Sequence, residues 1–295
     1  MGPATSEMAF SFAALPFLVY ALAECGLLAV MAHRLYAGIR LRHQATWQAC
    51  RLLLICALAG VILDNIRHFA GGFWADAASP PAFANVVYGL EAVHLVFVPL
   101  LLLVQVELCI AASAARLHKD STAANVQVIA DPLVGPPHLA KYSGEPGWST
   151  AARTVAAILA FGVAAAGAVN CAARLAATAE LGLVREEMFG VVVFTPVNLT
   201  AAEDMGHPTA GPDSLGVQFF GLSAVVAGAW IACRLRSFAY LCLSFAGLIG
   251  QALGGVSAQY LFFASNFFEI VSFGAIVLED WRLLVPLSRP DTING

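Results

Sequence analysis

Charged residues are scarce in this chain, and lysine is almost absent. Only 12% of its 295 residues are charged, whereas 60% are hydrophobic. Globular proteins carry roughly a quarter charged and about half apolar residues, so this composition excludes an ordinary soluble domain. The net charge of -4 comes without a clustered basic face, which argues against a nucleic-acid partner. Much of the surface is therefore expected to contact a lipid bilayer.

Several signatures of known chemistry are also missing. The seven cysteines form no Cys-x-x-Cys pair and lie in or beside apolar segments, as expected of buried free thiols. Both lysines, Lys119 and Lys141, fall in one loop, which excludes a retinal Schiff base in the last span. No Asn-Pro-x-x-Tyr pattern and no His-x-x-x-His pair occur. Any likeness to G-protein-coupled receptors is therefore topological only, and fold analogy gives no function.

What the chain does contain is a series of apolar segments, each about long enough to cross a bilayer as a helix. These segments predict an all-α, polytopic membrane protein, a single domain built as a seven-transmembrane-helix bundle. The expected spans cover about residues 9–31, 47–70, 86–114, 152–176, 215–233, 238–253 and 257–278.

The two longer connections are predicted to be loops. Residues 115–150 contain four prolines and indicate an irregular cytoplasmic loop. Residues 177–214 form the expected lumenal loop, and their apolar stretch from Met188 to Val197 is too short to span and is predicted to be interfacial. Gly254 and Gly255 are expected to form a tight turn between the last two spans.

Lysine and arginine placement predicts the orientation. Only Arg67, Arg174 and Arg185 of the 15 basic residues fall on or near the side that holds the N-terminus. By the positive-inside rule, the N-terminus is expected outside or in a lumen and the C-terminus in the cytoplasm. The sequence does not separate the plasma membrane from an endomembrane. The sequon Asn198-Leu199-Thr200 lies on the expected lumenal side.

Polar side chains inside the spans predict a site, because a charge at membrane depth is costly and usually faces a partner or a water-filled cavity. Helical spacing places Asp64 and His68 on one face of the second span, and Glu91 and His94 on one face of the third. Counting from the lumenal ends puts these groups at similar depths, about 8–12 Å from the surface. We therefore expect a polar cavity in the outer half of the bundle. Its further members would be Asn170, Gln251, Gln259, Asn266 and Glu269.

Several functions remain open for such a cavity. A transporter or receptor-like sensor would use Asp64, His68, Glu91, His94 and Glu269 as titrating groups. A membrane-embedded enzyme acting on a lipid or other apolar substrate would bind a transition metal through Asp64, His68, Glu91 and His94, and a haem between the two histidines is a further alternative. The same side chains would otherwise only hold helices together, with Arg67 on Asp64. Glu24 and Glu107 are expected to lie outside this cavity.

Overall fold

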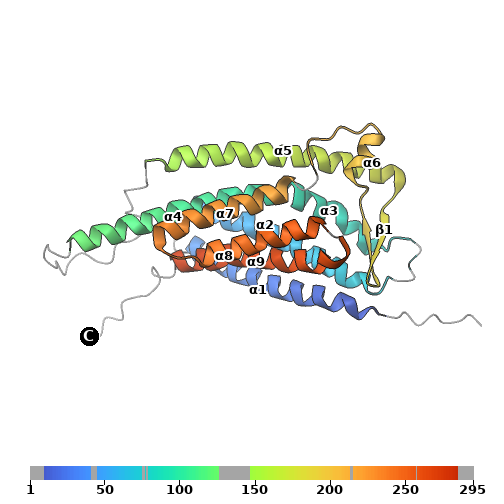
Figure 1. The fold of residues 1–295 in the computed structure, drawn as a ribbon, viewed down its shortest axis with the longest axis horizontal. Helices are drawn as coiled ribbons and strands as arrows, with labels where there is room; N and C mark the ends of the chain where they lie inside the picture. Colours follow the sequence, from blue (N-terminus) through green and yellow to red (C-terminus); the bar gives the residue numbers. More distant parts are fainter. Residues whose placement is uncertain are drawn as a thin grey trace, which may run out of the picture.

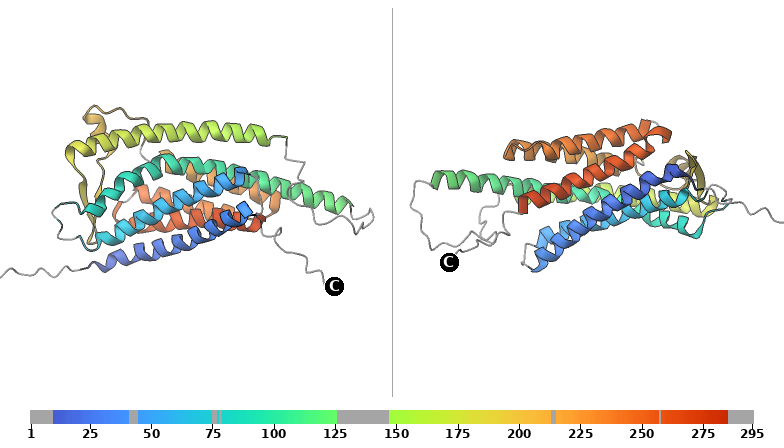
Figure 2. Two further views of the ribbon diagram at one scale, coloured as in Figure 1. Left: turned by 180° about the vertical axis from the view of Figure 1, so that it is seen from behind. Right: turned by 90° about the horizontal axis from the view of Figure 1, so that it is seen from below.

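The protein is an elongated bundle of long, roughly parallel helices with a small β-hairpin at one end (Figure 1). The computed structural model describes residues 10–40, 45–74, 77, 79–125, 147–212, 215–256 and 258–284. We call the end with the hairpin the hairpin end and the other the opposite end. Helix α1 begins at the hairpin end, and α2 returns to it (Figure 2).

Long helices make up most of the chain, and short helical segments and one β-hairpin lie between them. In order they are η1 (Phe12–Ala14), α1 (Leu15–Arg40), α2 (Ala45–Gly71), η2 (Ala82–Val86), α3 (Val87–Ala92), η3 (Val93–Phe97), α4 (Val98–Asn125), α5 (Ser149–Leu181), β1 (Val184–Met188), β2 (Val191–Thr195), α6 (Leu199–Asp204), α7 (Leu215–Leu235), α8 (Ala239–Val256) and α9 (Ala258–Leu284). Helix α1 packs against α2 and α9, while α4 packs against α5 and α7.

Five helical segments among the described residues are long and apolar enough to cross a bilayer. They are Phe12–Ala37, Ala45–Gly71, Ala82–Arg116, Ser149–Leu181 and Leu215–Leu235. Apolar runs of this length are helical because hydrocarbon offers no partner to an unpaired backbone N–H or C=O group. The predicted all-α class is thus confirmed, and five such helices are compatible with a multi-pass membrane protein. The expected sixth and seventh spans correspond to α8 and α9.

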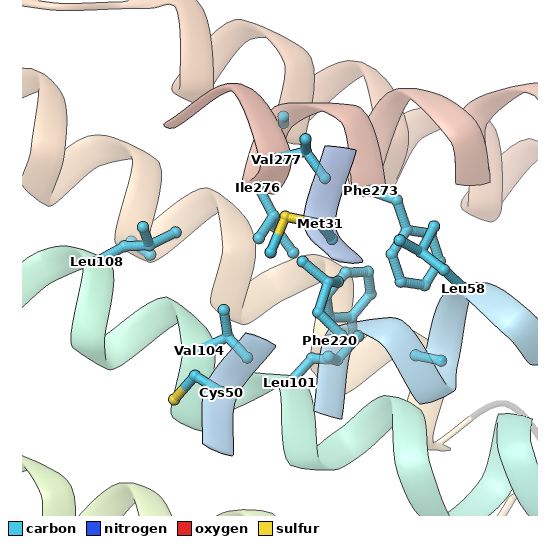
Figure 3. Close-up of a cluster of buried hydrophobic side chains, with 14 of the residues drawn as sticks. Met31, Cys50, Leu58, Leu101, Val104, Leu108, Phe220, Phe273, Ile276 and Val277 are labelled. Atoms are coloured by element: carbon cyan, nitrogen blue, oxygen red, sulfur yellow. The ribbon is translucent and has the colours of Figure 1, made fainter. Parts of the chain in front are cut away.

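The main hydrophobic core lies between α1, α2, α4, α7, α8 and α9. Figure 3 shows Met31 of α1 beside Ile276 of α9, with Leu101 of α4 and Phe220 of α7 below them. The ring of Phe220 stacks on that of Phe273, with centroids 5.9 Å apart. The central helices are therefore joined by dense apolar packing, and the polar groups discussed below lie within this framework.

The third span contains a π-helical segment, η3, which has an identifiable cause. Pro99 has no N–H group, so it cannot donate the helical hydrogen bond to the carbonyl of Leu95. That carbonyl faces Gly167 of α5, where a Cβ atom would lie 1.9 Å from its oxygen. Two further glycines pack closely here: a Cβ atom at Gly60 of α2 would lie 2.4 Å from the Val93 side chain, and one at Gly216 of α7 would lie 2.9 Å from that of Pro99. Glycine thus lets three helices approach the irregular turn that carries His94.

The β-hairpin corrects our expectation for the loop after α5. The stretch from Met188 to Val197, predicted to be interfacial, includes strand β2, which pairs antiparallel with β1. Phe189 and Gly190 form the turn with φ of 54° and 76°, as a type I′ hairpin requires. Val191 and Val193 of β2 pack against Phe17, whereas Val192 and Phe194 pack against Ala84 on the other face. An apolar run buried on both faces shows no alternation that would identify a strand.

Two boundaries also differ from the prediction. Helix α4 continues to Asn125, well past the expected end of the third span. Gly254 and Gly255 lie within α8 and do not form the expected turn. The central part of the loop predicted at residues 115–150 lies outside the described residues.

The glycine contact at η3 gives a stability test. Gly167→Ala is expected to destabilise the protein by about 1–3 kcal/mol, because the added methyl group displaces the Leu95 carbonyl. Gly162→Ala is the matched control on the same helix, since nothing lies within 4 Å of its Cβ position. Alanine favours a helix over glycine by up to about 1 kcal/mol, so the control should be neutral or stabilised. Thermal unfolding in detergent measures both, and equal melting temperatures would contradict the packing described.

Candidate functional site

Asp64 is held by an arginine of its own helix. The Nη2 atom of Arg67 lies 2.7 Å from Oδ1 of Asp64, and its Nε atom donates to the same oxygen at 3.1 Å. The remaining nitrogen, Nη1, donates to the carbonyl of Phe194 in β2 at 3.0 Å. This ion pair, expected as one of the alternatives, therefore also joins α2 to the hairpin.

His68 is engaged by its surroundings on both ring nitrogens. Its Nδ1 atom lies 2.8 Å from the backbone oxygen of Asp64, and its Nε2 atom lies 3.4 Å from Nη2 of Arg67. Phe17 stacks on the imidazole, with ring centroids 5.0 Å apart. Both ring nitrogens therefore already contact other groups of α2.

Glu91 is paired with Arg174, a partner that sequence reasoning missed. The Nη1 atom of Arg174 lies 2.7 Å from Oε2 of Glu91, and its Nε atom donates to the carbonyl of Val197 at 3.0 Å. Thr178, one turn further along α5, accepts a hydrogen bond from the Val197 amide at 2.9 Å. A second buried ion pair therefore fixes the chain just after β2. An arginine near the end of an Ala-rich apolar helix was the available signal.

His94 and Glu269 approach each other across the bundle. Their Nε2 and Oε1 atoms are 3.8 Å apart, and the side chains are 23% and 18% exposed. Asn266, one turn before Glu269 on α9, is buried. These three predicted residues keep the expected inward orientation. Asn170 instead forms hydrogen bonds with the loop before α7: it accepts from the Ala210 amide and donates to the Gly211 carbonyl. The side chains of Gln251 and Gln259 lie outside the described residues.

Glu24 corrects the expectation that it lies outside the polar interior. It is 0% exposed, and the Nδ2 atom of Asn65 donates to its two carboxylate oxygens at 2.9 and 3.1 Å. Asn65 directly follows Asp64, and Glu24 is close enough to Asp64 and Glu269 to interact with them electrostatically. The position of Glu24 along α1 did not reveal that it faces this part of α2.

We call Glu24, Asn65, His94 and Glu269 the central polar cluster. Among the described residues, neither of its carboxylates forms an ion pair with lysine or arginine, in contrast to Asp64 and Glu91. The Oδ1 atom of Asn65 is buried and has no hydrogen-bond partner among the described residues, and Asn65 is 0% exposed. The cluster thus offers carboxyl and amide oxygen atoms without an arginine from the described part of the chain beside them.

The predicted metal set of Asp64, His68, Glu91 and His94 is divided between different contacts. Asp64 pairs with Arg67 and lies 3.6 Å from Nδ1 of His68, Glu91 pairs with Arg174, and His94 faces Glu269. Across the part of the chain that the structure describes, no group of three or more His, Cys, Asp or Glu side chains is arranged to hold a metal ion.

Comparisons with protein-family models, with curated proteins and with solved structures give no match.

The Glu91–Arg174 pair gives a prediction about the hairpin. Arg174→Gln or Glu91→Gln alone is expected to cost about 2–4 kcal/mol, because a largely buried charge loses its partner. The double variant should lose clearly less than the sum, since no lone charge remains. Thermal unfolding in detergent gives the three values.

Arg185→Gln is the control for these variants. Arg185 pairs with Glu187 on the exposed strand β1, where the side chains are 38% and 50% exposed. Arg185→Gln should change the free energy of unfolding by no more than about 0.5 kcal/mol. Single variants at Glu91 and Arg174 that behave like this control would show that the pair does not hold the hairpin.

Proposed function

We propose that α8 and α9 complete a bundle of seven membrane-crossing helices. Helix α8 has 18 residues and α9 has 27, which correspond to about 27 Å and about 40 Å of helix against a hydrocarbon thickness of about 30 Å. They pack against each other, and α8 packs against α7. If α8 and α9 both cross the membrane, Arg234 at the end of α7 and Arg282 at the end of α9 lie on the same side of it.

The distribution of arginine between the two ends supports an outside or lumenal hairpin end. The hairpin end holds three arginines, each in an ion pair: Arg67 with Asp64, Arg174 with Glu91 and Arg185 with Glu187. The opposite end carries Arg34, Arg116, Arg153, Arg234, Arg236 and Arg282 among the described residues. By the positive-inside rule, the end with more arginine faces the cytoplasm.

Within this bundle we propose a transporter that carries a small monovalent cation. The support is the central polar cluster, where Glu24 and Glu269 have no arginine partner, and the Oδ1 atom of Asn65 has no hydrogen-bond partner, among the described residues. Carboxyl and amide oxygens suit a positively charged ligand, and acidic side chains at membrane depth usually face a partner or a water-filled cavity.

Ionic contacts on both sides of the cluster favour transport over mere binding. Toward the hairpin end, the pairs of Asp64 with Arg67 and Glu91 with Arg174 hold β2 and the following residues in place. Toward the opposite end, Asp280 of α9 lies 3.2 Å from Arg51 of α2. Alternate release of such contacts would open the cluster to one side at a time.

A receptor-like sensor is the second candidate, because the same cluster can bind a cation without carrying it across. The π-helical segment supports this alternative, since such segments occur often at functional sites and η3 places His94 against α9. The two candidates differ in whether the bound cation crosses the membrane.

Cation binding and uptake test the proposal. Purified protein is expected to bind radiolabelled sodium or methylammonium, and proteoliposomes are expected to take up the same cation. Glu24→Gln should weaken binding at least about tenfold, which corresponds to about 1.4 kcal/mol, because it replaces one carboxyl oxygen with an amide nitrogen that cannot bind a cation and keeps the shape of the side chain. Scintillation proximity and filter uptake assays provide the measurements.

Glu187→Gln is the matched control, since Glu187 is an exposed carboxylate on β1. This variant should bind and transport like the unmodified protein. Binding that Glu24→Gln abolishes, without any uptake, would identify a sensor. Failure of both cations to bind, or equal binding by both variants, would refute the proposed site.

A further inference from the structure

A second buried cluster of charges lies at the opposite end, between α1, α2 and α9. Arg51 donates to the carboxylate of Asp280 from Nη2 at 3.2 Å and from Nε at 3.4 Å. Arg34 donates to the same carboxylate from Nε at 3.5 Å. Arg34 also donates from Nη2 to the backbone oxygen of Asp280 at 3.2 Å. The side chains of Arg51 and Asp280 are 2% and 4% exposed, so this is a built site and not a surface contact.

The cluster carries an excess of positive charge. Two guanidinium groups share one carboxylate, and the charges that act most strongly on Arg34 are those of Asp280 and Arg51. The Nη1 atom of Arg51 donates a hydrogen bond to the backbone oxygen of Arg34 at 3.2 Å. The Nη1 atom of Arg34 has no hydrogen-bond partner among the described residues, and its side chain is 12% exposed. A donor with net positive charge behind it therefore remains available to an anion.

Aromatic rings place this donor at the membrane surface. The guanidinium of Arg34 lies over the ring of Trp281, 5.2 Å from its centroid, and Arg51 lies 6.0 Å from that of Trp47. Trp281 is 46% exposed, and the neighbouring Leu278 is 60% exposed. Tryptophan is enriched where lipid head groups meet hydrocarbon. The open side of the cluster thus faces lipid between α1 and α9.

We propose that Arg34, supported by Arg51 and Asp280, binds the phosphate group of an anionic membrane lipid. The planar guanidinium suits bidentate phosphate binding, and the exposed Trp281 ring packs against the glycerol and upper acyl region. With the orientation proposed above, this lipid belongs to the cytoplasmic leaflet, where anionic lipids are concentrated. Lipid binding here would stabilise the contact between α1 and α9 at the opposite end.

Lipid titration of the purified protein tests this inference. Delipidated protein in detergent is mixed with phosphatidylglycerol, phosphatidylcholine or inorganic phosphate, and bound lipid is counted by native mass spectrometry. The unmodified protein should bind phosphatidylglycerol at least about tenfold more tightly than phosphatidylcholine. Arg34→Gln should lose this preference, whereas Arg34→Lys should retain part of it because the charge remains.

Arg234→Gln is the matched control. Arg234 is also at the opposite end and also lies over a tryptophan, 4.7 Å from the ring centroid of Trp230. Its variant should bind phosphatidylglycerol like the unmodified protein. Melting temperatures in phosphatidylcholine verify that each variant is folded. Equal losses in Arg34→Gln and Arg234→Gln, or displacement of the lipid by millimolar inorganic phosphate, would overturn the proposed lipid site.

Discussion

Hydrocarbon provides no partner for a polar group, and this constraint organises the whole structure. It makes the apolar segments helical, and it requires each buried charge to find a partner inside the bundle. Asp64 and Glu91 find arginines, and those arginines also satisfy the Phe194 and Val197 carbonyls near the hairpin. Burial of the hairpin at one end of the bundle therefore depends on the same ion pairs that satisfy charges at membrane depth.

The exceptions to this pairing are what suggest a function. Glu24 and Glu269 have amide or imidazole neighbours in place of arginines, and the Oδ1 atom of Asn65 has none. At the opposite end the imbalance is reversed, since two arginines share Asp280. One site thus favours a cation and the other an anion. The contacts of Asp280 connect α1, α2 and α9, and the same three helices supply Glu24, Asn65 and Glu269 of the central polar cluster.

The sequence predicted those elements whose signal is local. The second span, expected at 47–70, is Ala45–Gly71, and the fifth, expected at 215–233, is Leu215–Leu235. The hairpin was missed because β2 is buried on both faces and its partner β1 is polar. Of the residues predicted for the cavity, His94 and Glu269 lie 3.8 Å apart and Asn266 is buried, whereas the contacts of Arg174 and Glu24 depend on which helices face each other. Spacing along one helix gives the shared face of Asp64 and Arg67, whereas partners from other helices follow only from packing.

The sidedness of the two chain ends tests most directly whether hydrocarbon surrounds seven crossings. Epitope tags on the N- and C-termini, probed in intact and then permeabilised cells, should give the N-terminal tag at the outer face and the C-terminal tag only after permeabilisation. An exposed tag inserted at Glu187 in β1 should report with the N-terminus, because the hairpin end carries little free positive charge. If both terminal tags lie on the same side, the number of crossings is even and the account is wrong.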